Sequence, residues 1–187
     1  MDTILRRIQS EYHYTDFEIA QIKYVVQIVL SESSKLLFLV LFFGIIGKSL
    51  EFLITLAVLF PLRITCGGIH CKHYWSCFLT TFLFIVLCIV LPQWGYPATT
   101  SALTILFICM LLHYRYAPVT SIFRPILTHK KIYESKLKSF CYILIDSSII
   151  FLVEMNPYAG IIFWTIVLQT AQLIIAYYLR KDVKNVD

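Results

Sequence analysis

CFLTTFLFIVLCIVL, residues 77–91, contains no charged side chain and lies near the middle of a 187-residue chain that is 59% hydrophobic and 14% charged. Soluble domains carry about 25% charged residues, so this composition indicates an integral membrane protein. A helix that crosses a bilayer needs about 20 apolar residues, with latitude for tilt and interfacial ends. We expect an all-α, polytopic protein with about six hydrophobic helices, in the stretches 25–47, 49–62, 76–91, 98–113, 139–155 and 157–179.

The rest of the chain predicts a simple organisation. Residues 1–24 form an amphipathic segment with apolar and basic side chains on opposite sides, which is typical of a helix that lies in the bilayer surface. No internal repeat or low-complexity linker interrupts the sequence, so we expect residues 1–187 to form a single domain. The net charge of +5 bears on orientation and on anionic lipid, and we expect no nucleic-acid partner.

The lysines and arginines predict the orientation in a cell membrane. With six spans and the N-terminus inside, all 16 of these residues fall on the cytoplasmic side except Lys35, inside the first span, and Lys48. Positive charge is retained on the cytoplasmic side of membrane proteins. Both termini, the segment 66–77 and a basic loop over 114–138 are therefore expected to share the cytoplasmic face.

The segment CGGIHCKHYWSC, residues 66–77, carries the chemistry of the chain. Cys77 opens the apolar run, which predicts a place in the first turn of a helix, where a thiolate nucleophile is favoured. His70 is a candidate base, yet seven residues on one straight helix separate the two by about 10.5 Å along the axis. A dyad therefore requires His70 to leave the helix, and Gly67 and Gly68 give the backbone that freedom.

Two other interpretations of this segment stay open on the residues alone. Zinc binds cysteine and histidine side chains, and the segment offers five of them: Cys66, His70, Cys71, His73 and Cys77. Structural zinc sites usually take two separated pairs of ligands, and no second pair exists here. The segment could also be a polar turn between buried helices. The alternative function is thus a small polytopic transporter or metal-handling membrane protein.

The pattern Arg63-x4-Gly68-x-His70-x6-Cys77, between two apolar stretches, resembles the accessory gene regulator B (AgrB) family. Two further segments are similar to that family: ESSKLLFLVLFFGIIGKSL at 32–50 and the proline-marked basic segment at 115–138. The resemblance covers nearly the whole chain. It implies a membrane-embedded cysteine endopeptidase that cleaves an AgrD-like propeptide and supports its cyclisation to a thiolactone or lactone. It also favours a homodimer, with no cofactor and no metal.

Under this resemblance each functional residue of the family falls on one position. The nucleophile falls on Cys77, the histidine on His70, the motif arginine on Arg63 and the motif glycine on Gly68, with Gly67 in support. The remaining cysteines and histidine of the segment receive no role.

Other polar residues have two interpretations each. Asp146, inside an apolar stretch, is a candidate third member of the site or a partner of a basic residue. Glu32 and Lys35 are spaced to pair on one helix face. Gln169 and Gln172 can join neighbouring helices. The lysines of the basic loop either meet anionic lipid or attract an acidic part of the propeptide: Lys130, Lys131, Lys136 and Lys138.

Overall fold

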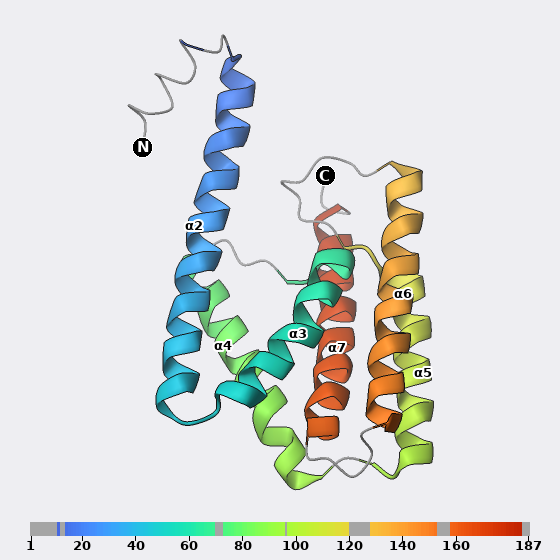
Figure 1. The fold of residues 1–187 in the computed structure, drawn as a ribbon. Coiled ribbons are helices and arrows are strands. Elements are labelled where there is room, and N and C mark those ends of the chain that lie inside the picture. Colours follow the sequence, from blue (N-terminus) through green and yellow to red (C-terminus); the bar gives the residue numbers. More distant parts are fainter. Residues whose placement is uncertain are drawn as a thin grey trace. The chain divides into compact units, whose positions relative to one another are not determined.

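The structure is a computed structural model that describes residues 11, 14–69, 73–95, 97–119, 128–152 and 158–184. These residues are almost entirely helical, as predicted, and contain no strand apart from an isolated parallel bridge between Gly67 and Val119. The chain divides into two compact units, Met1–Gly47 and Lys48–Asp187 (Figure 1). The expected single domain over 1–187 stays a prediction.

The described part of the first unit consists mainly of the long helix α2 (Asp16–Ile45). A capping box starts it: Thr15 accepts the backbone N–H of Glu18, and the Glu18 carboxylate accepts the backbone N–H of Thr15 at 2.9 Å. The bonds from the backbone and hydroxyl of Thr15 lower the pKa of Glu18. The helix is continuous across residue 24, where the amphipathic segment was expected to end. Half of that segment, residues 1–10, 12 and 13, lies outside the described residues.

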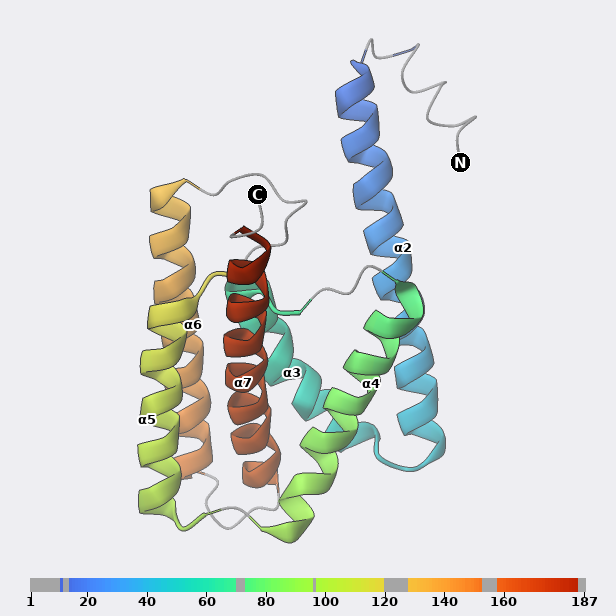
Figure 2. The same ribbon diagram turned by 180° about the vertical axis from the view of Figure 1, so that it is seen from behind.

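The second unit is a helical bundle whose consecutive long helices alternate in direction (Figures 1 and 2). Its elements are α3 (Ser49–Cys66), α4 (Tyr74–Val90), the short 3₁₀ helix η1 (Leu91–Trp94), α5 (Thr99–Tyr116), α6 (His129–Leu152) and α7 (Tyr158–Lys184). Helix α7 contacts all four other long helices of this unit. The C-terminal ends of α3, α5 and α7 and the N-terminal ends of α4 and α6 meet at one end, which we call the motif end.

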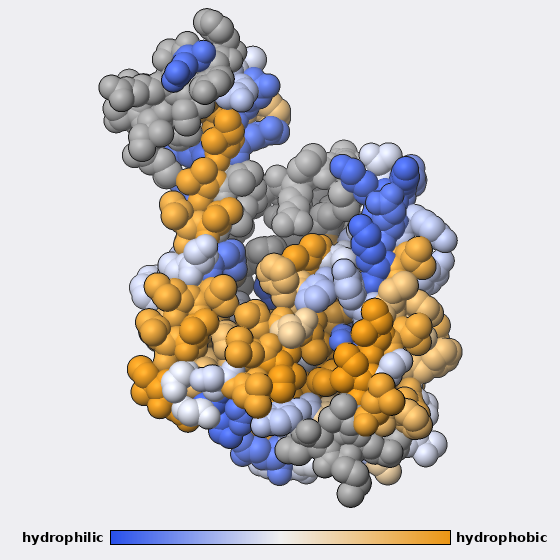
Figure 3. Space-filling view, viewed as in Figure 1, coloured by the Kyte–Doolittle hydropathy of each residue, from blue (hydrophilic) through white to orange (hydrophobic). Residues whose placement is uncertain are grey.

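The interior of this bundle is built from apolar side chains that the sequence places on one face of each helix. One buried cluster combines residues from four helices: Leu62 of α3, Leu106 of α5, Ile143 of α6, and Phe163 and Ile166 of α7. Many outward-facing side chains are apolar too, and Figure 3 shows them in orange on the face of this bundle that it presents. In lipid, helices associate through van der Waals packing and interhelical hydrogen bonds rather than through burial from water.

Three helical segments in the described part of the chain are long and apolar enough to cross a membrane: Ser49–Cys66, Tyr74–Trp94 and Tyr158–Leu179. A shorter apolar helix covers Thr100–Tyr116. Within the described residues, each of the six predicted apolar stretches overlaps one long helix. The protein is therefore an all-helical membrane protein, and six complete spans stay a prediction.

The basic loop predicted over 114–138 is shorter than expected. Residues 129–138 form the first turns of α6, and residues 114–116 end α5; residues 120–127 lie outside the described residues. The sequence HKKIYESKLK contains no proline or glycine, and nothing in it opposes a helix. Marking helices by apolar runs misses such a polar helical extension. All four candidate lysines thus belong to a helix, and Figure 3 shows this end of α6 as hydrophilic.

Candidate active site

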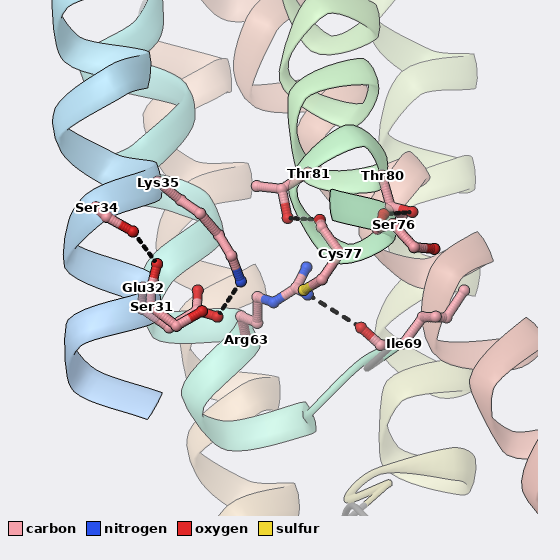
Figure 4. A network of polar contacts seen from close by, with 10 residues as sticks. All are labelled: Ser31, Glu32, Ser34, Lys35, Arg63, Ile69, Ser76, Cys77, Thr80 and Thr81. Atoms are coloured by element: carbon pink, nitrogen blue, oxygen red, sulfur yellow. Dashed lines mark hydrogen bonds and ion pairs between the residues drawn. The ribbon is translucent and has the colours of Figure 1, made fainter. Parts of the chain in front are cut away.

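Cys77 lies in the first turn of α4, as predicted. The helix begins at Tyr74 with His73 as its N-cap, and the backbone N–H of Cys77 donates to the carbonyl oxygen of His73 at 3.1 Å. The Cys77 side chain is 7% exposed. It lies at the motif end, where the helix dipole favours negative charge. Figure 4 shows Cys77 of α4 and Arg63 of α3 pointing toward the same space.

Arg63 holds its guanidinium in the last turn of α3 with two hydrogen bonds. One nitrogen donates to Oε1 of Gln172 at 3.1 Å, and another donates to the carbonyl oxygen of Ile69 at 3.2 Å (Figure 4 draws the second). The predicted stretch ends at residue 62, whereas α3 contains Pro61 and extends to Cys66. Because α3 continues to Cys66, Arg63 extends from a helix and not from a loop.

A turn over residues 67–69 follows α3, and Gly67 is indispensable to its geometry. Gly67 has φ +78°, a conformation that residues with a Cβ rarely adopt. A Cβ at this position would lie 2.0 Å from the carbonyl oxygen of Val119. The approach is that close because the backbone N–H of Val119 donates to the carbonyl oxygen of Cys66 at 2.8 Å. A Cβ on Gly68 would meet nothing closer than Oε1 of Gln172, at 3.4 Å.

Gln169 fixes the same turn from α7. Its Nε2 donates to the carbonyl oxygen of Gly67 at 3.1 Å, and its side chain is completely buried. Its Oε1 has no hydrogen-bond partner among the described residues. The prediction that Gln169 and Gln172 join neighbouring helices is confirmed, since both link α7 to α3 or to the turn that follows it.

The structure contains a cysteine–histidine pair that the sequence analysis did not identify. Sγ of Cys66 lies 3.0 Å from Nδ1 of His113 on α5, and Nε2 of His113 lies 3.0 Å from Oγ1 of Thr170 on α7. The Thr170 hydroxyl donates to the carbonyl oxygen of Ile166, so it accepts from Nε2–H of His113. Nδ1 is then the acceptor for the Cys66 thiol.

This second pair has the features of a structural contact. Cys66 and His113 are both completely buried, and both nitrogens of the imidazole are already engaged. The three side chains join α3, α5 and α7 inside the bundle. A histidine at the end of the apolar stretch 98–113 was a signal that sequence reasoning could have used, but its partners are 47 and 57 residues away in the chain.

The remaining predicted residues are dispersed. Asp146 lies on α6, and α3 and α7 separate α6 from α4, so the structure does not bring Asp146 beside Cys77 (Figures 1 and 2). Its role as a third member of the site stays a prediction.

The predicted pair of Glu32 and Lys35 is confirmed within the first unit, where the two side chains are 2.7 Å apart. Lys136 lies over the ring of Tyr114, with its Nζ 5.6 Å from the centroid.

His70 lies outside the described residues, and so does Cys71. The dyad of His70 and Cys77 therefore stays a prediction. Among the side chains that the structure describes, no group of three or more histidine, cysteine, aspartate or glutamate residues could hold a metal ion. The sulfur of Cys66, one of the five possible zinc ligands, contacts Nδ1 of His113.

These features define an all-helical membrane protein with a cysteine at the start of an apolar helix. An arginine points toward the same space as this cysteine, and hydrogen bonds with α7 hold that arginine and the glycine turn that follows α3. The chain belongs to the accessory gene regulator B (AgrB) family, which matches residues 1–173. This family is associated with the processing of quorum-sensing propeptides in the membrane, and that association supports a role in such processing for this chain.

Individual relatives agree with the family assignment. An AgrB-like protein of Clostridium perfringens (strain 13 / Type A) is 27% identical over 167 residues, which is 87% of either chain. An AgrB-like protein of Clostridium beijerinckii is 27% identical over 110 residues, 58% of this chain and 55% of that protein. The chain thus spans about half the length of the latter. No solved structure matches the chain.

Proposed function

We propose that this chain is a membrane-embedded cysteine endopeptidase that cleaves an AgrD-like propeptide at the C-terminal side of the future ring. The observation that carries the proposal is the position of Cys77, in the first turn of α4 and directed toward the space that Arg63 also faces. A helix N-terminus favours the thiolate that attacks a peptide carbonyl. The family assignment supports the choice of substrate.

The first step forms an acyl-enzyme. His70 takes the proton from the Cys77 thiol as Sγ bonds to the scissile carbonyl carbon, and it then gives this proton to the amine as the C–N bond breaks. The C-terminal fragment leaves with its new amino group. The N-terminal fragment stays bound to Cys77 as a thioester.

The oxyanion of this step needs donors at the start of α4. The N–H of Cys77 already donates to the carbonyl oxygen of His73. The N–H groups of Trp75 and Ser76 belong to the first turn, which has no intrahelical acceptors, so they are the better donors. The Arg63 guanidinium contributes positive charge on the side of α3.

The second step closes the ring. A thiol or hydroxyl inside the bound fragment attacks the thioester carbonyl, and the bond between that carbon and Sγ breaks. The product is a thiolactone or a lactone, and Cys77 regains its proton. Exclusion of water at the boundary of the membrane favours this attack over hydrolysis.

The proposal includes the orientation and the partners of the chain. The motif end faces the cytoplasm, because it carries most of the basic residues. The four lysines of α6 attract an acidic part of the propeptide. The family resemblance favours two copies in a homodimer.

Coexpression with the propeptide encoded beside this chain tests the proposal. Cys77→Ser should abolish cleavage. Cys88→Ser, a matched change at a buried cysteine of the same helix, should leave cleavage intact. Cleavage that persists in Cys77→Ser would contradict the proposed nucleophile. Equal losses in Cys77→Ser, Cys71→Ser and Cys66→Ser would favour a metal site.

A further inference from the structure

Two glutamines of α7 are built into the motif end by bonds to the segment that precedes His70. Gln169 donates to the carbonyl oxygen of Gly67, and Gln172 accepts from Arg63, which in turn donates to the carbonyl oxygen of Ile69. Residues three apart lie on one face of a helix. The first and last residues of the turn 67–69 are thus both connected to the same face of α7.

The chemistry of the partners fixes the orientation of both side-chain amides. A carbonyl oxygen cannot donate, so the nitrogen of Gln169 must face Gly67; a guanidinium cannot accept, so the oxygen of Gln172 must face Arg63. The two amides therefore have opposite roles. Gln169 is needed as a donor, whereas Gln172 is needed as an acceptor.

Gln169 is also an unfavourable residue for the stability of the bundle. Its side chain is completely buried, and its Oε1 has no partner among the described residues. Leaving a buried polar atom unpaired opposes folding, and an apolar side chain of similar size would avoid that penalty. A residue that donates a hydrogen bond to the turn but lowers the stability of the fold is typical of a functional position.

We propose that Gln169 and Gln172 are positioning residues for the peptidase reaction. They hold the turn 67–69 and the Arg63 guanidinium in the geometry that the start of α4 requires. This inference rests on the proposed function and adds two residues of α7 to it. Neither residue touches the reacting atoms in this account, so both act through the turn and through Arg63.

Kinetics of purified variants in bilayer nanodiscs, with the propeptide encoded beside this chain as substrate, test the inference. In Gln169→Met and Gln172→Met, kcat should fall by as much as about 10²-fold, because small displacements in an active site have effects of that size. KM should stay near its original value, since binding of the propeptide is not disturbed. Gln172→Glu keeps an oxygen acceptor for Arg63, so its kcat should fall much less than that of Gln172→Met.

Thermal unfolding distinguishes positioning from a merely structural role. Gln169→Met removes the unpaired buried oxygen but also leaves the Gly67 carbonyl oxygen without its donor. These effects oppose each other, so its unfolding midpoint should stay near that of the unchanged protein while kcat falls. Two controls accompany it. Thr165→Val removes a buried hydroxyl of α7 that bonds to Ile161 of the same helix, and Gln93→Met changes an exposed glutamine at the opposite end of the bundle. Both should retain kcat.

Normal kcat in folded Gln169→Met and Gln172→Met would overturn the inference. A fall in kcat in Gln172→Glu as large as the fall in Gln172→Met would overturn it too. If Gln172→Met fails to fold, a normal kcat in folded Gln169→Met would still overturn the inference. The proposed function fails separately, if Cys77→Ser continues to cleave the propeptide.

Discussion

The sulfur of Cys66 lies 3.0 Å from Nδ1 of His113, inside the bundle and among three helices. The cysteine–histidine contact that the structure describes is therefore not the pair that the sequence predicts. Cys77 lies at the start of α4 and faces the space near Arg63. The two cysteines should respond differently to substitution, and that difference separates structure from catalysis.

Cys66→Ala should lower stability without abolishing cleavage. It leaves a buried imidazole nitrogen without its donor, which costs about 1–3 kcal/mol. Cys66→Ser keeps a donor for that nitrogen, so it should lose less stability than Cys66→Ala. Thermal unfolding in detergent measures both effects, and cleavage is assayed at a temperature where both variants stay folded. If folded Cys66→Ala were as inactive as Cys77→Ala, Cys66 would have to take part in the reaction.

Alanine substitutions at the two glycines of the turn should have very different effects on cleavage. Gly67→Ala places a Cβ 2.0 Å from the Val119 carbonyl oxygen and imposes a positive φ, so the turn must rearrange and cleavage should be lost. Gly68→Ala meets only ordinary contacts and should keep most of the activity. Cleavage by both variants, normalised to the folded protein in the membrane, is the measurement. Equal losses would show that Gly68 has a role beyond the contacts described.

The lysines of α6 should act on binding of the propeptide. Lys130→Gln/Lys131→Gln removes two exposed charges from its first turn and should raise KM while leaving kcat unchanged. The effect should diminish as salt is added, because exposed charges are screened within about 10 Å at 0.1 M. Lys48→Gln, at the opposite end of the bundle, is the control. A change in kcat alone would argue against a docking role.

Labelling from the two sides of the membrane should separate the ends of the bundle. In a background without its native cysteines, Thr128→Cys lies at the motif end and should react with an impermeant maleimide only from the cytoplasmic side. Trp94→Cys, exposed at the other end, should react from outside. The reverse pattern would exclude the proposed orientation.

The helical class and the approximate places of the described long helices followed from sequence, because apolar runs are local signals. The polar start of α6 did not follow, since its lysines continue a helix without adding hydrophobicity. The end of α3 shows the same limit, since the apolar stretch was expected to end at residue 62 and the helix continues to Cys66.

The site was predictable only in part. The position of Cys77 in a first turn and a turn after α3 both follow from neighbouring residues. The partners of that turn do not, because Gln169 and Val119 are 102 and 52 residues from Gly67 in the sequence and meet it only in the folded bundle. The contact of Cys66 with His113 likewise depends on how α3 and α5 pack.

The central claim is that Cys77 carries the N-terminal fragment of the propeptide as a thioester. Replacing the internal cysteine or serine of the propeptide with alanine blocks ring closure and should trap that adduct. Intact-mass analysis under single-turnover conditions should show this chain with the added mass of the fragment. The adduct should disappear with hydroxylamine and be absent in Cys77→Ala. Cleavage that continues in Cys77→Ala, with no adduct on the unchanged protein, would contradict the account.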